Sequence, residues 1–499
     1  MKSYHEHPLR ILRYSAKNIW LLIFPIIRSI NVIRFDRDFL YNWLRGAWFD
    51  LLIIGAILVF GFVRWFFSQI VVGETAIVHR LGFFVRVIKT IPYANMSSVT
   101  IEHPFYFKPF RAAIVRCDTS AGILNATDMK LMVSEKTANV IMEHIPDVSE
   151  ATKIKDIIDP SELSVMLFSA FFSSGFSGVV YIALFLIKGG SIARDIISIS
   201  INSIQTQTAH ISERLVLKIP FAAVLLGLFI IGTWLLSFIV NLLRYSRFNT
   251  DVDENCLNIR YGITTRKEFR IMPSHINYTD MRQNLIMKYM GMVAVNISCA
   301  GYGSDSNSMP VLTPVKKERS IGRELEHIGI FAGVRNDFRT LRTGFWNYIW
   351  LPVTLGAALI PAQKRIVEFF PKFSELSYFV LIMFEVLLGW FTLIKLTAWW
   401  TSGIALYDDK ILVRCCKWSF FHTVVSERRK LVKVTFEQTI MQEFWGTCAV
   451  GFWFEGEEYR KYKVKSMSVQ NAARIAELLD CAGSARLLKK GVFNRKRRK

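Results

Sequence analysis

Few residues in this chain have the types and spacing that catalysis or metal binding requires. The sequence contains no G-x-x-x-x-G-K-[ST] phosphate loop, no G-x-G-x-x-G, no H-E-x-x-H and no C-x-x-C. Asp251, Asp253 and Glu254 form a carboxylate group that suits a divalent cation or a polar turn, and its place before a predicted strand favours the turn. We therefore expect no catalytic residue, no cofactor and no metal site.

Cysteine and histidine do not suggest a site either. The cysteines lie mostly at predicted strand positions, where small core residues in a reducing cytoplasm are expected. They are Cys117, Cys256, Cys299, Cys415, Cys416, Cys448 and Cys481. The run His5-Glu6-His7 lies close to the terminus, and we expect it to be solvated rather than to bind a metal ion.

Glu385 is the polar residue that needs a separate explanation, because it lies inside the apolar run 376–400. An ionised carboxylate at the centre of a bilayer costs about 3 kcal/mol or more, so Glu385 should face another helix or a wet cavity, or be protonated. A structural hydrogen bond and a transport role are the two interpretations. No acidic residue recurs at a matching place in the other apolar runs, which favours the structural one.

Basic residues form the remaining chemical signal. Near anionic lipid each is worth about 1 kcal/mol, while the alternative is a solvated strand face, and the sequence does not decide between them. Nucleic acid is a poorer partner, because the basic stretches lack interleaved aromatic residues for base stacking. The candidate lipid or partner contacts are Arg260, Arg266, Lys267, Arg270, Arg428, Arg429, Lys430 and Lys433.

The elements that would position these residues are apolar helices. Of 499 residues 52% are hydrophobic and 20% charged, with a net charge of +22. Several runs reach the roughly 20 residues that cross a bilayer core, while 18–33 carries Arg28 and either spans or lies in the interface. The runs are 18–33, 47–71, 163–187, 215–243, 344–361 and 376–400. An integral membrane protein with helices in three pairs is predicted.

Each helix pair precedes a polar block, so the chain repeats one plan three times. In the second block Leu257, Ile259 and Tyr261 alternate with polar residues, as in a half-buried strand, and Gly262 then opens a turn. Each block ends in a helical pattern, as in 468–479. The predicted plan is 1–71 with helix pair 1, block 72–160, helix pair 161–244, block 245–342, helix pair 343–400, block 401–484 and a basic tail 485–499. Each block is expected to be a small antiparallel sheet with a closing helix.

The middle block also resembles a known family. Its pattern comprises Leu257–Glu268, then Ile271-Met272-Pro273, Arg282-Gln283-Asn284-Leu285, Tyr289-Met290-Gly291 and Ala300-Gly301. This resembles the bacterial membrane-flanked pleckstrin-homology-like family of the YdbS/YdbT type. The first block keeps a weaker form in 80–84 and 90–92, and the third lacks the Ile-Pro and Ala-Gly marks. The resemblance implies pleckstrin-homology-like domains on pairs of transmembrane helices, and it implies no catalytic residue.

The expected protein is a multi-pass protein of a bacterial cell membrane with three cytoplasmic β-rich domains. Its expected function is that of a non-enzymatic scaffold or sensor whose domains contact lipid head groups, other membrane proteins or copies of itself. A transporter or channel component is the first alternative, and a membrane-bound enzyme is the second. The tail is expected to orient the third domain against anionic lipid, because its charges gain attraction close to an anionic leaflet.

The helix pairs predict that all three blocks lie on the cytoplasmic side. An even number of crossings separates the blocks, and Arg244, Arg247, Arg339 and Arg342 follow or precede predicted spans, as residues on the inside do. Reporter fusions after residues 150, 320 and 484 should therefore all give the cytoplasmic signal. An extracytoplasmic signal from any one of them contradicts this topology.

Overall fold

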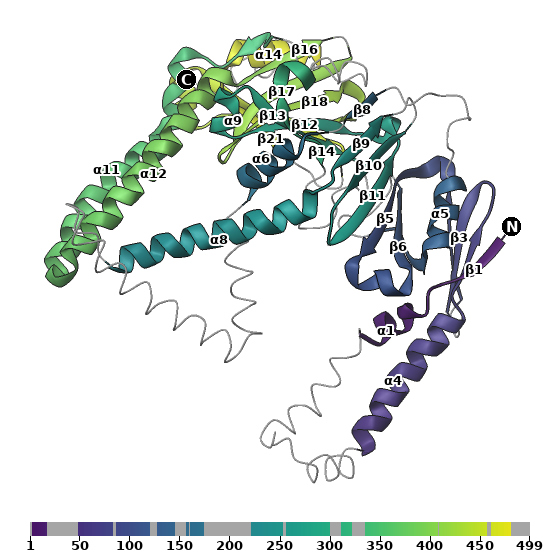
Figure 1. The fold of residues 1–499 in the computed structure, drawn as a ribbon. Helices are drawn as coiled ribbons and strands as arrows, with labels where there is room; N and C mark the ends of the chain where they lie inside the picture. Colours follow the sequence, from purple (N-terminus) through teal and green to yellow (C-terminus); the bar gives the residue numbers. More distant parts are fainter. Residues whose placement is uncertain are drawn as a thin grey trace. The chain divides into compact units, whose positions relative to one another are not determined.

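The structure is a computed structural model that describes most of the chain (Figure 1). The described residues are 2–16, 48–82, 86–119, 127–144, 156–158, 160–173, 221–252, 256–299, 311–321, 335–407, 409–456 and 461–480. They divide into two compact units. Unit 1 comprises Met1–Ile158, Asn249–Ile276 and Cys299–Ser308, and unit 2 comprises Asp159–Phe248, Asn277–Ser298 and Met309–Lys499.

The first repeat shows the plan that the others follow. Strand β1 (Lys2–His5) precedes the helices α1 (Leu9–Ala16) and α4 (Trp48–Phe66). The strands β2 (Gln69–Val72), β3 (Ala76–Leu81) and β4 (Val87–Pro92) then complete a four-stranded sheet with the order β1-β2-β3-β4. A short 3-10 helix, η3 (Tyr93–Asn95), leads to β5 (Met96–Pro104), η4 (Phe105–Phe110), β6 (Ala112–Thr119), β7 (Met129–Ser134) and the closing helix α5 (Glu135–His144).

The second repeat has the same order of elements. Strand β8 (Asp156–Ile158) precedes α6 (Glu162–Phe172) and α8 (Phe221–Tyr245), and β9 (Asn249–Val252), β10 (Leu257–Tyr261) and β11 (Thr265–Ile271) follow. The 3-10 helix η5 (Pro273–His275) leads to β12 (Tyr278–Gln283), α9 (Leu285–Tyr289), β13 (Met292–Ser298) and β14 (Val311–Lys317). Residues 318–321 then begin the closing helix.

The third repeat is the most completely described. It contains β15 (Phe338–Arg339), η6 (Arg342–Phe345), α11 (Trp346–Phe369), η7 (Pro371–Phe373) and α12 (Ser374–Thr401). The strands β16 (Gly403–Tyr407), β17 (Lys410–Lys417) and β18 (Phe420–Glu427) follow, and then η8 (Arg428–Lys430). The last part is β19 (Leu431–Glu437), α13 (Ile440–Phe444), β20 (Thr447–Phe454), β21 (Lys461–Ser468) and α14 (Val469–Leu478).

Each repeat thus has a four-strand part and a three-strand part, and these parts pair across repeats. One seven-stranded sheet has the order β7-β6-β5-β11-β10-β9-β8, so three strands of the first repeat continue into four of the second. The other has the order β14-β13-β12-β18-β17-β16-β15, so three strands of the second repeat continue into four of the third. The two parts of the middle repeat consequently belong to different compact units.

The first strand of each repeat lies before the helices, and the sequence analysis did not place it there. β1 pairs with β2, β8 with β9 and β15 with β16, all antiparallel. The helices are therefore an insertion between the first two strands of a sheet. Residues 156–158 and 338–339, which the sequence analysis assigned to the ends of the first and second blocks, pair with the strands of the following repeat.

Positive φ angles recur at equivalent turns and show how closely the repeats match. The hairpin between the third and fourth strands has Gly82 at φ 99°, Gly262 at 102° and Trp418 at 56°. The residue before the middle strand of the three-strand part has φ 49° at Arg111 and 63° at both Gly291 and Gly446. The carbonyls of these three residues accept hydrogen bonds from the backbone amides at the start of the closing helix. The donors are Glu135 to Arg111, Glu318 to Gly291 and Val469 to Gly446.

Among the described residues, three helices are long and apolar enough to cross a membrane, over Gly227–Tyr245, Arg342–Phe369 and Ser377–Thr401. Ile54–Phe66 and Glu162–Phe172 are shorter apolar helices. The predicted run 344–361 underestimates α11, which continues to Phe369 with Pro352 and Pro361 inside it. The polar residues after Pro361 end the apolar run, whereas a proline removes only one backbone donor and the helix goes on. The predicted run 18–33 and the tail 485–499 lie outside the described residues.

Gly262 provides a direct test of the hairpin geometry. Its φ of 102° is favourable only for glycine, so Gly262→Val should destabilise the β10–β11 hairpin by about 1 to 3 kcal/mol. Hydrogen exchange of the hairpin amides in the detergent-solubilised full chain measures this local stability. The neighbouring, exposed Ile263 gives the control Ile263→Val, which should leave the exchange nearly unchanged. Equal exchange in both variants would contradict the strained turn.

Candidate functional site: helix–sheet junctions, basic faces and buried ion pairs

Each four-strand sheet is joined to an apolar helix by a very short connection. α4 ends at Phe66 and β2 begins at Gln69, α8 ends at Tyr245 and β9 begins at Asn249, and α12 ends at Thr401 and β16 begins at Gly403. A connection of one to three residues cannot act as a flexible tether. In the first and third repeats, where helix and sheet lie in the same compact unit, the orientation of the sheet is therefore coupled to that of its helix.

In unit 2 the pair α11–α12, which lie side by side in Figure 1, is also fixed to the third repeat by side chains. The Tyr348 hydroxyl donates to the Lys465 carbonyl at 3.1 Å, and the Asn347 amide donates to the Ser466 hydroxyl at 2.9 Å. Gly344 lies so close to Ser466 that an added Cβ would lie 2.3 Å from its Cβ, so only glycine permits this approach. The helix pair and the β21 strand consequently form one rigid assembly.

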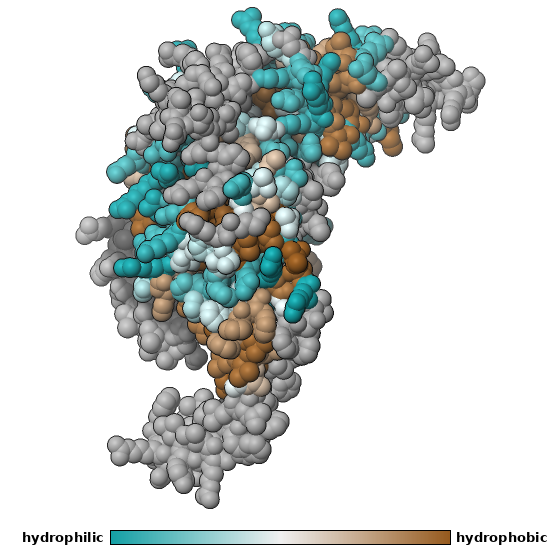
Figure 2. Space-filling model, turned by 90° about the vertical axis from the view of Figure 1, so that its right-hand side faces the viewer, coloured by the Kyte–Doolittle hydropathy of each residue, from teal (hydrophilic) through white to brown (hydrophobic). Residues whose placement is uncertain are grey.

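Exposed apolar side chains surround the base of this helix pair. A buried cluster joins Leu285 of α9, Phe421 of β18 and several residues of α11 and α12. Around it Tyr289 is 78% exposed, Trp400 77% and Trp418 79%, and Lys395 of α12 donates to the Trp418 carbonyl at 2.8 Å. We call the exposed residues Ile286, Tyr289, Met290, Trp346, Trp400 and Trp418 the collar. Hydrophobic side chains are likewise exposed beside hydrophilic ones on the face in Figure 2.

Of the predicted basic residues in the second block, two are held by buried or half-buried partners. Lys267 lies 3.3 Å from the Glu102 carboxylate, and Arg270 donates to the Met142 carbonyl at 2.8 Å and to Asn258 at 3.1 Å. Arg260 and Arg266 are more exposed, and they lie 3.7 Å from Asp251 and 2.7 Å from Glu268. The sequence cluster is therefore divided into two structural cations and two surface cations.

Three of the predicted basic residues of the third block lie at the end of β18 that is away from Trp418. Trp418 precedes β18, and Arg428, Arg429 and Lys430 form η8 directly after it. Eight residues of strand extend roughly 26 Å at about 3.3 Å each. Arg428 donates to the Leu478 carbonyl, whereas Arg429 is largely exposed and lies 3.8 Å from Asp409.

Lys433 belongs to a second basic face, on the sheet β19–β21, which the sequence analysis indicated only in part. Lys433 and Lys461 lie 5.9 Å and 5.8 Å from the ring centroid of Trp453. Glu437 accepts from Lys461 and Lys463, and these hydrogen bonds lower the pKa of its carboxyl to about 2. The alternation of Lys461 and Lys463 with apolar residues also indicates this face in the sequence.

Glu385 of α12 lies against α11. A Cβ added to Gly356 would be 3.0 Å from a Glu385 carboxylate oxygen, so this glycine allows the carboxylate to approach the neighbouring helix. The structure thus places a polar group between two helices that the sequence interprets as membrane spans. Whether its role is structural or in transport remains a prediction of the sequence analysis.

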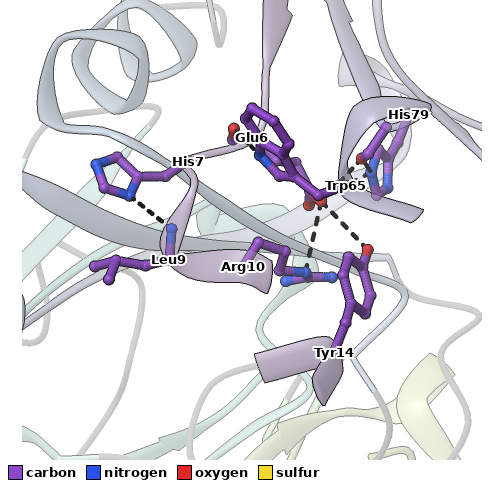
Figure 3. Close-up of polar contacts among 8 residues, drawn as sticks. Glu6, His7, Leu9, Arg10, Tyr14, Trp65 and His79 are labelled. Atoms are coloured by element: carbon purple, nitrogen blue, oxygen red, sulfur yellow. Dashed lines mark hydrogen bonds and ion pairs between the residues drawn. The ribbon is translucent and has the colours of Figure 1, made fainter. Parts of the chain in front are cut away.

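The expectation that residues 5–7 are solvated was wrong for Glu6, whose side chain is 1% exposed (Figure 3). Its Oε2 accepts from the Ser68 hydroxyl at 2.8 Å and from the Tyr14 hydroxyl at 3.3 Å, and Arg10 Nε lies 3.5 Å away. The Trp65 indole also donates to the Glu6 carbonyl at 2.7 Å. These partners lie on α1, α4 and the residue before β2, so burial follows from the pairing of β1 with β2.

His79 completes this cluster from β3. Its Nε2 lies 3.1 Å from the Ser68 hydroxyl and 3.5 Å from Glu6 Oε1. Burial, with the charges of Arg10 and Lys89, lowers the pKa of His79 to about 4, so the ring is neutral at pH 7. Since the single Ser68 proton is donated to Glu6, Nε2 of His79 must carry the ring proton. Ser68 thus links Glu6 to His79, while among the described residues Glu6 Oε1 and Arg10 Nη1 are buried without a hydrogen-bond partner.

A second buried network lies where β12 pairs with β18. The Asp280 side chain, on a residue that is 2% exposed, lies 2.9 Å from His422 Nδ1 and accepts from Arg282 Nε at 2.8 Å. The Tyr462 hydroxyl donates to the same carboxylate at 3.4 Å. Burial alone raises the pKa of Asp280, but the His422 and Arg282 charges and hydrogen bonds outweigh it, so the pKa is held well below its usual range.

Within the described part of the chain, no group of three His, Cys, Asp or Glu side chains could hold a metal ion. The carboxylates of residues 253–254 lie outside the described residues. Burial raises the pKa of Cys117 and of Cys448 to about 12, so both thiols are protonated and unreactive at neutral pH.

A sheet of four strands, a sheet of three strands and a closing helix define a pleckstrin-homology-like class of fold. The family model "Bacterial PH domain" matches residues 26–160 and 210–327, which together make up just over half of the chain. The protein therefore belongs to the bacterial PH domain family, as the resemblance in the sequence indicated. No curated protein and no solved structure matched the chain.

The Asp280 network predicts a large effect of removing one partner. Asp280→Ala leaves Arg282 and His422 without their buried acceptor, so the free energy of local unfolding at β12 and β18 should fall by about 3 kcal/mol. Because the pKa of Asp280 is depressed in the folded state, its contribution is present above about pH 4, near the unfolded value, and decreases as the pH falls further. Hydrogen exchange of the β12 and β18 amides in the full chain measures both effects.

The control for this prediction is Asp251→Ala, which removes a partly exposed partner of Arg260. An exposed pair is worth roughly 1 kcal/mol or less, so exchange at β9 and β10 should change little. An equally small effect of Asp280→Ala at neutral pH would show that the buried network contributes nothing to the pairing of β12 with β18.

Proposed function

We propose that this protein is a non-enzymatic, membrane-anchored scaffold or sensor. Its apolar helices hold the PH-like repeats at the cytoplasmic face of the cell membrane, where different faces contact lipid head groups and partner proteins. The observation that carries the proposal is the rigid connection between apolar helices and sheets, with an exposed aromatic collar at the place where the two meet. Tryptophan and tyrosine are enriched at membrane–water interfaces, since one end of the side chain is apolar and the other polar.

The collar supports a defined position of the third repeat relative to the membrane–water interface. Trp346 begins α11, Trp400 lies in the last turn of α12, and the turn that contains Trp418 is tied to α12 through Lys395. All three tryptophans are exposed in the structure of the protein alone, where water would surround them. At a membrane interface the same side chains would be buried among head groups, and nearby basic residues such as Lys417 and Arg342 would meet anionic lipid.

The basic residues after β18 fit a partner protein better than the protein's own bilayer. Arg429 and Lys430 follow the end of β18 that lies roughly 26 Å of strand away from Trp418, the collar residue before β18. Electrostatic attraction to a lipid surface falls off within a Debye length of about 8 Å at physiological salt. We therefore assign lipid contact to the collar, and partner contact to Arg429 and Lys430.

Depth measurements on the reconstituted full chain test this assignment. Spin labels at Trp418→Cys and Tyr289→Cys should be shielded from an aqueous relaxation agent, whereas a label at Arg429→Cys should be fully accessible. The charge reversals Lys417→Glu with Arg342→Glu should reduce co-purification of anionic lipid about fivefold or more, while Arg429→Glu with Lys430→Glu should not. Equal aqueous access at all three labelled sites would contradict the proposed membrane orientation.

A further inference from the structure

The two junctions between repeats follow one rule. In both, the first strand of a three-strand part pairs with the last strand of the next repeat's four-strand part, antiparallel. At the first junction Ser98, the third residue after η3, lies opposite Ile271, the second residue before η5. At the second junction Tyr278, the third residue after η5, lies opposite Ser426, the second residue before η8. Two independent pairs of strands with little sequence in common thus share the same register.

Two further strands of these kinds lie at the ends of the series of repeats, and in the described chain neither pairs with a strand of another repeat. β4 is the last strand of the first repeat's four-strand sheet, and among the described residues it pairs only with β3. β19 is the first strand of the third repeat's three-strand sheet, and in the described chain it pairs only with β20. One chain therefore presents both halves of a third junction, each at the edge of its own sheet.

Residues of β4 and β19 are more exposed than the equivalent residues at the two internal junctions. At the first junction Glu102 is buried beside Lys267, and Ser98 and Thr100 are buried as well. The equivalent residues of β19 are Lys433, Thr435 and Glu437, and these are exposed or half-buried. On β4, Ile88 is 63% exposed, although it is a large apolar residue. Open strand edges of this kind are templates for pairing with another strand.

We propose that β19 of one copy pairs with β4 of a second copy, which continues the series of repeats head to tail from chain to chain. The internal rule fixes the register: Lys433 opposite Ile91, Thr435 opposite Lys89 and Glu437 opposite Val87. Such a contact joins two different surfaces and so leaves one β4 and one β19 open on each assembly, from which it can grow or close into a ring. The inference deepens the proposed scaffold role by naming its partner, and rests on that role only for the membrane setting.

Disulfide trapping tests the partner and the register together. Full-length copies with Thr435→Cys and one tag are mixed in detergent with copies that carry Lys89→Cys and a second tag. We expect a disulfide-linked product that carries both tags. The matched control replaces Lys89→Cys by Ile88→Cys, an exposed neighbour whose side chain lies on the opposite face of the strand, and should give far less product. Equal yields from the two mixtures would overturn the proposed register.

The charge at position 87 gives a second test that does not depend on cysteine chemistry. Val87 is exposed and takes the place that Lys267 holds at the first junction, while Glu437 takes the place of Glu102. Val87→Lys should therefore tighten self-association about fivefold, and Val87→Glu should weaken it by a similar factor. Analytical ultracentrifugation in detergent measures both, and identical behaviour of the two variants contradicts the proposal.

The remaining outcomes are also decisive. If the double variant Thr435→Cys, Lys89→Cys forms a disulfide within single chains and none between copies, the chain closes on itself and the second copy is excluded as the occupant. If all variants remain monomeric in detergent and in native membranes, a different protein occupies the edges. Neither result changes the spin-label depths at Trp418 and Tyr289, so failure of this inference is distinguishable from failure of the membrane orientation.

Discussion

Strand pairing across repeats is the constraint on which the rest of this structure depends. A three-strand sheet that ended at β5 or β12 would expose a row of unpaired backbone donors and acceptors, and the adjoining repeat supplies the partners. Buried charges are placed on these paired strands, with Glu102 beside Lys267 in one case and Asp280 beside His422 in the other. Removing a repeat would take Lys267 from Glu102 or His422 from Asp280 and would leave an open edge, so the repeats are not independent modules.

The helices impose a second constraint, because they interrupt each sheet after its first strand. The sheet can form only if the helix pair returns the chain to the place where it left, as β15 and β16 show on either side of α11 and α12. The contacts of Tyr348 and Asn347 with β21 then fix the helix pair against the three-strand part as well. A tilt of the helices would therefore be transmitted to the sheets directly, without a flexible linker to absorb it.

Local patterns in the sequence predicted much of this fold. Alternation around Leu257 and Ile259 indicated strands, and Gly262 indicated a turn with positive φ. The long-range features left no local signal. Strand β15 has two residues, too few for any periodicity, and the pairing of β5 with β11 depends on residues far apart in the chain. Glu6 was predicted to be solvated because it lies near the terminus, and its partners, such as Ser68, follow only some 60 residues later in the chain.

The position of the helices between the first two strands has a consequence for the order of events during synthesis. β1 leaves the ribosome first, but β2, its partner, begins only at Gln69, after the helical segment. At roughly 5 to 20 residues per second the interval is on the order of 3 to 13 s, far longer than the microseconds in which a hairpin closes. During that interval Glu6 has neither Ser68 nor His79 as a partner. Closure of each four-strand sheet thus requires that the helices between its first two strands have been synthesised and have returned the chain to the first strand, which makes formation of the helices a precondition of sheet folding.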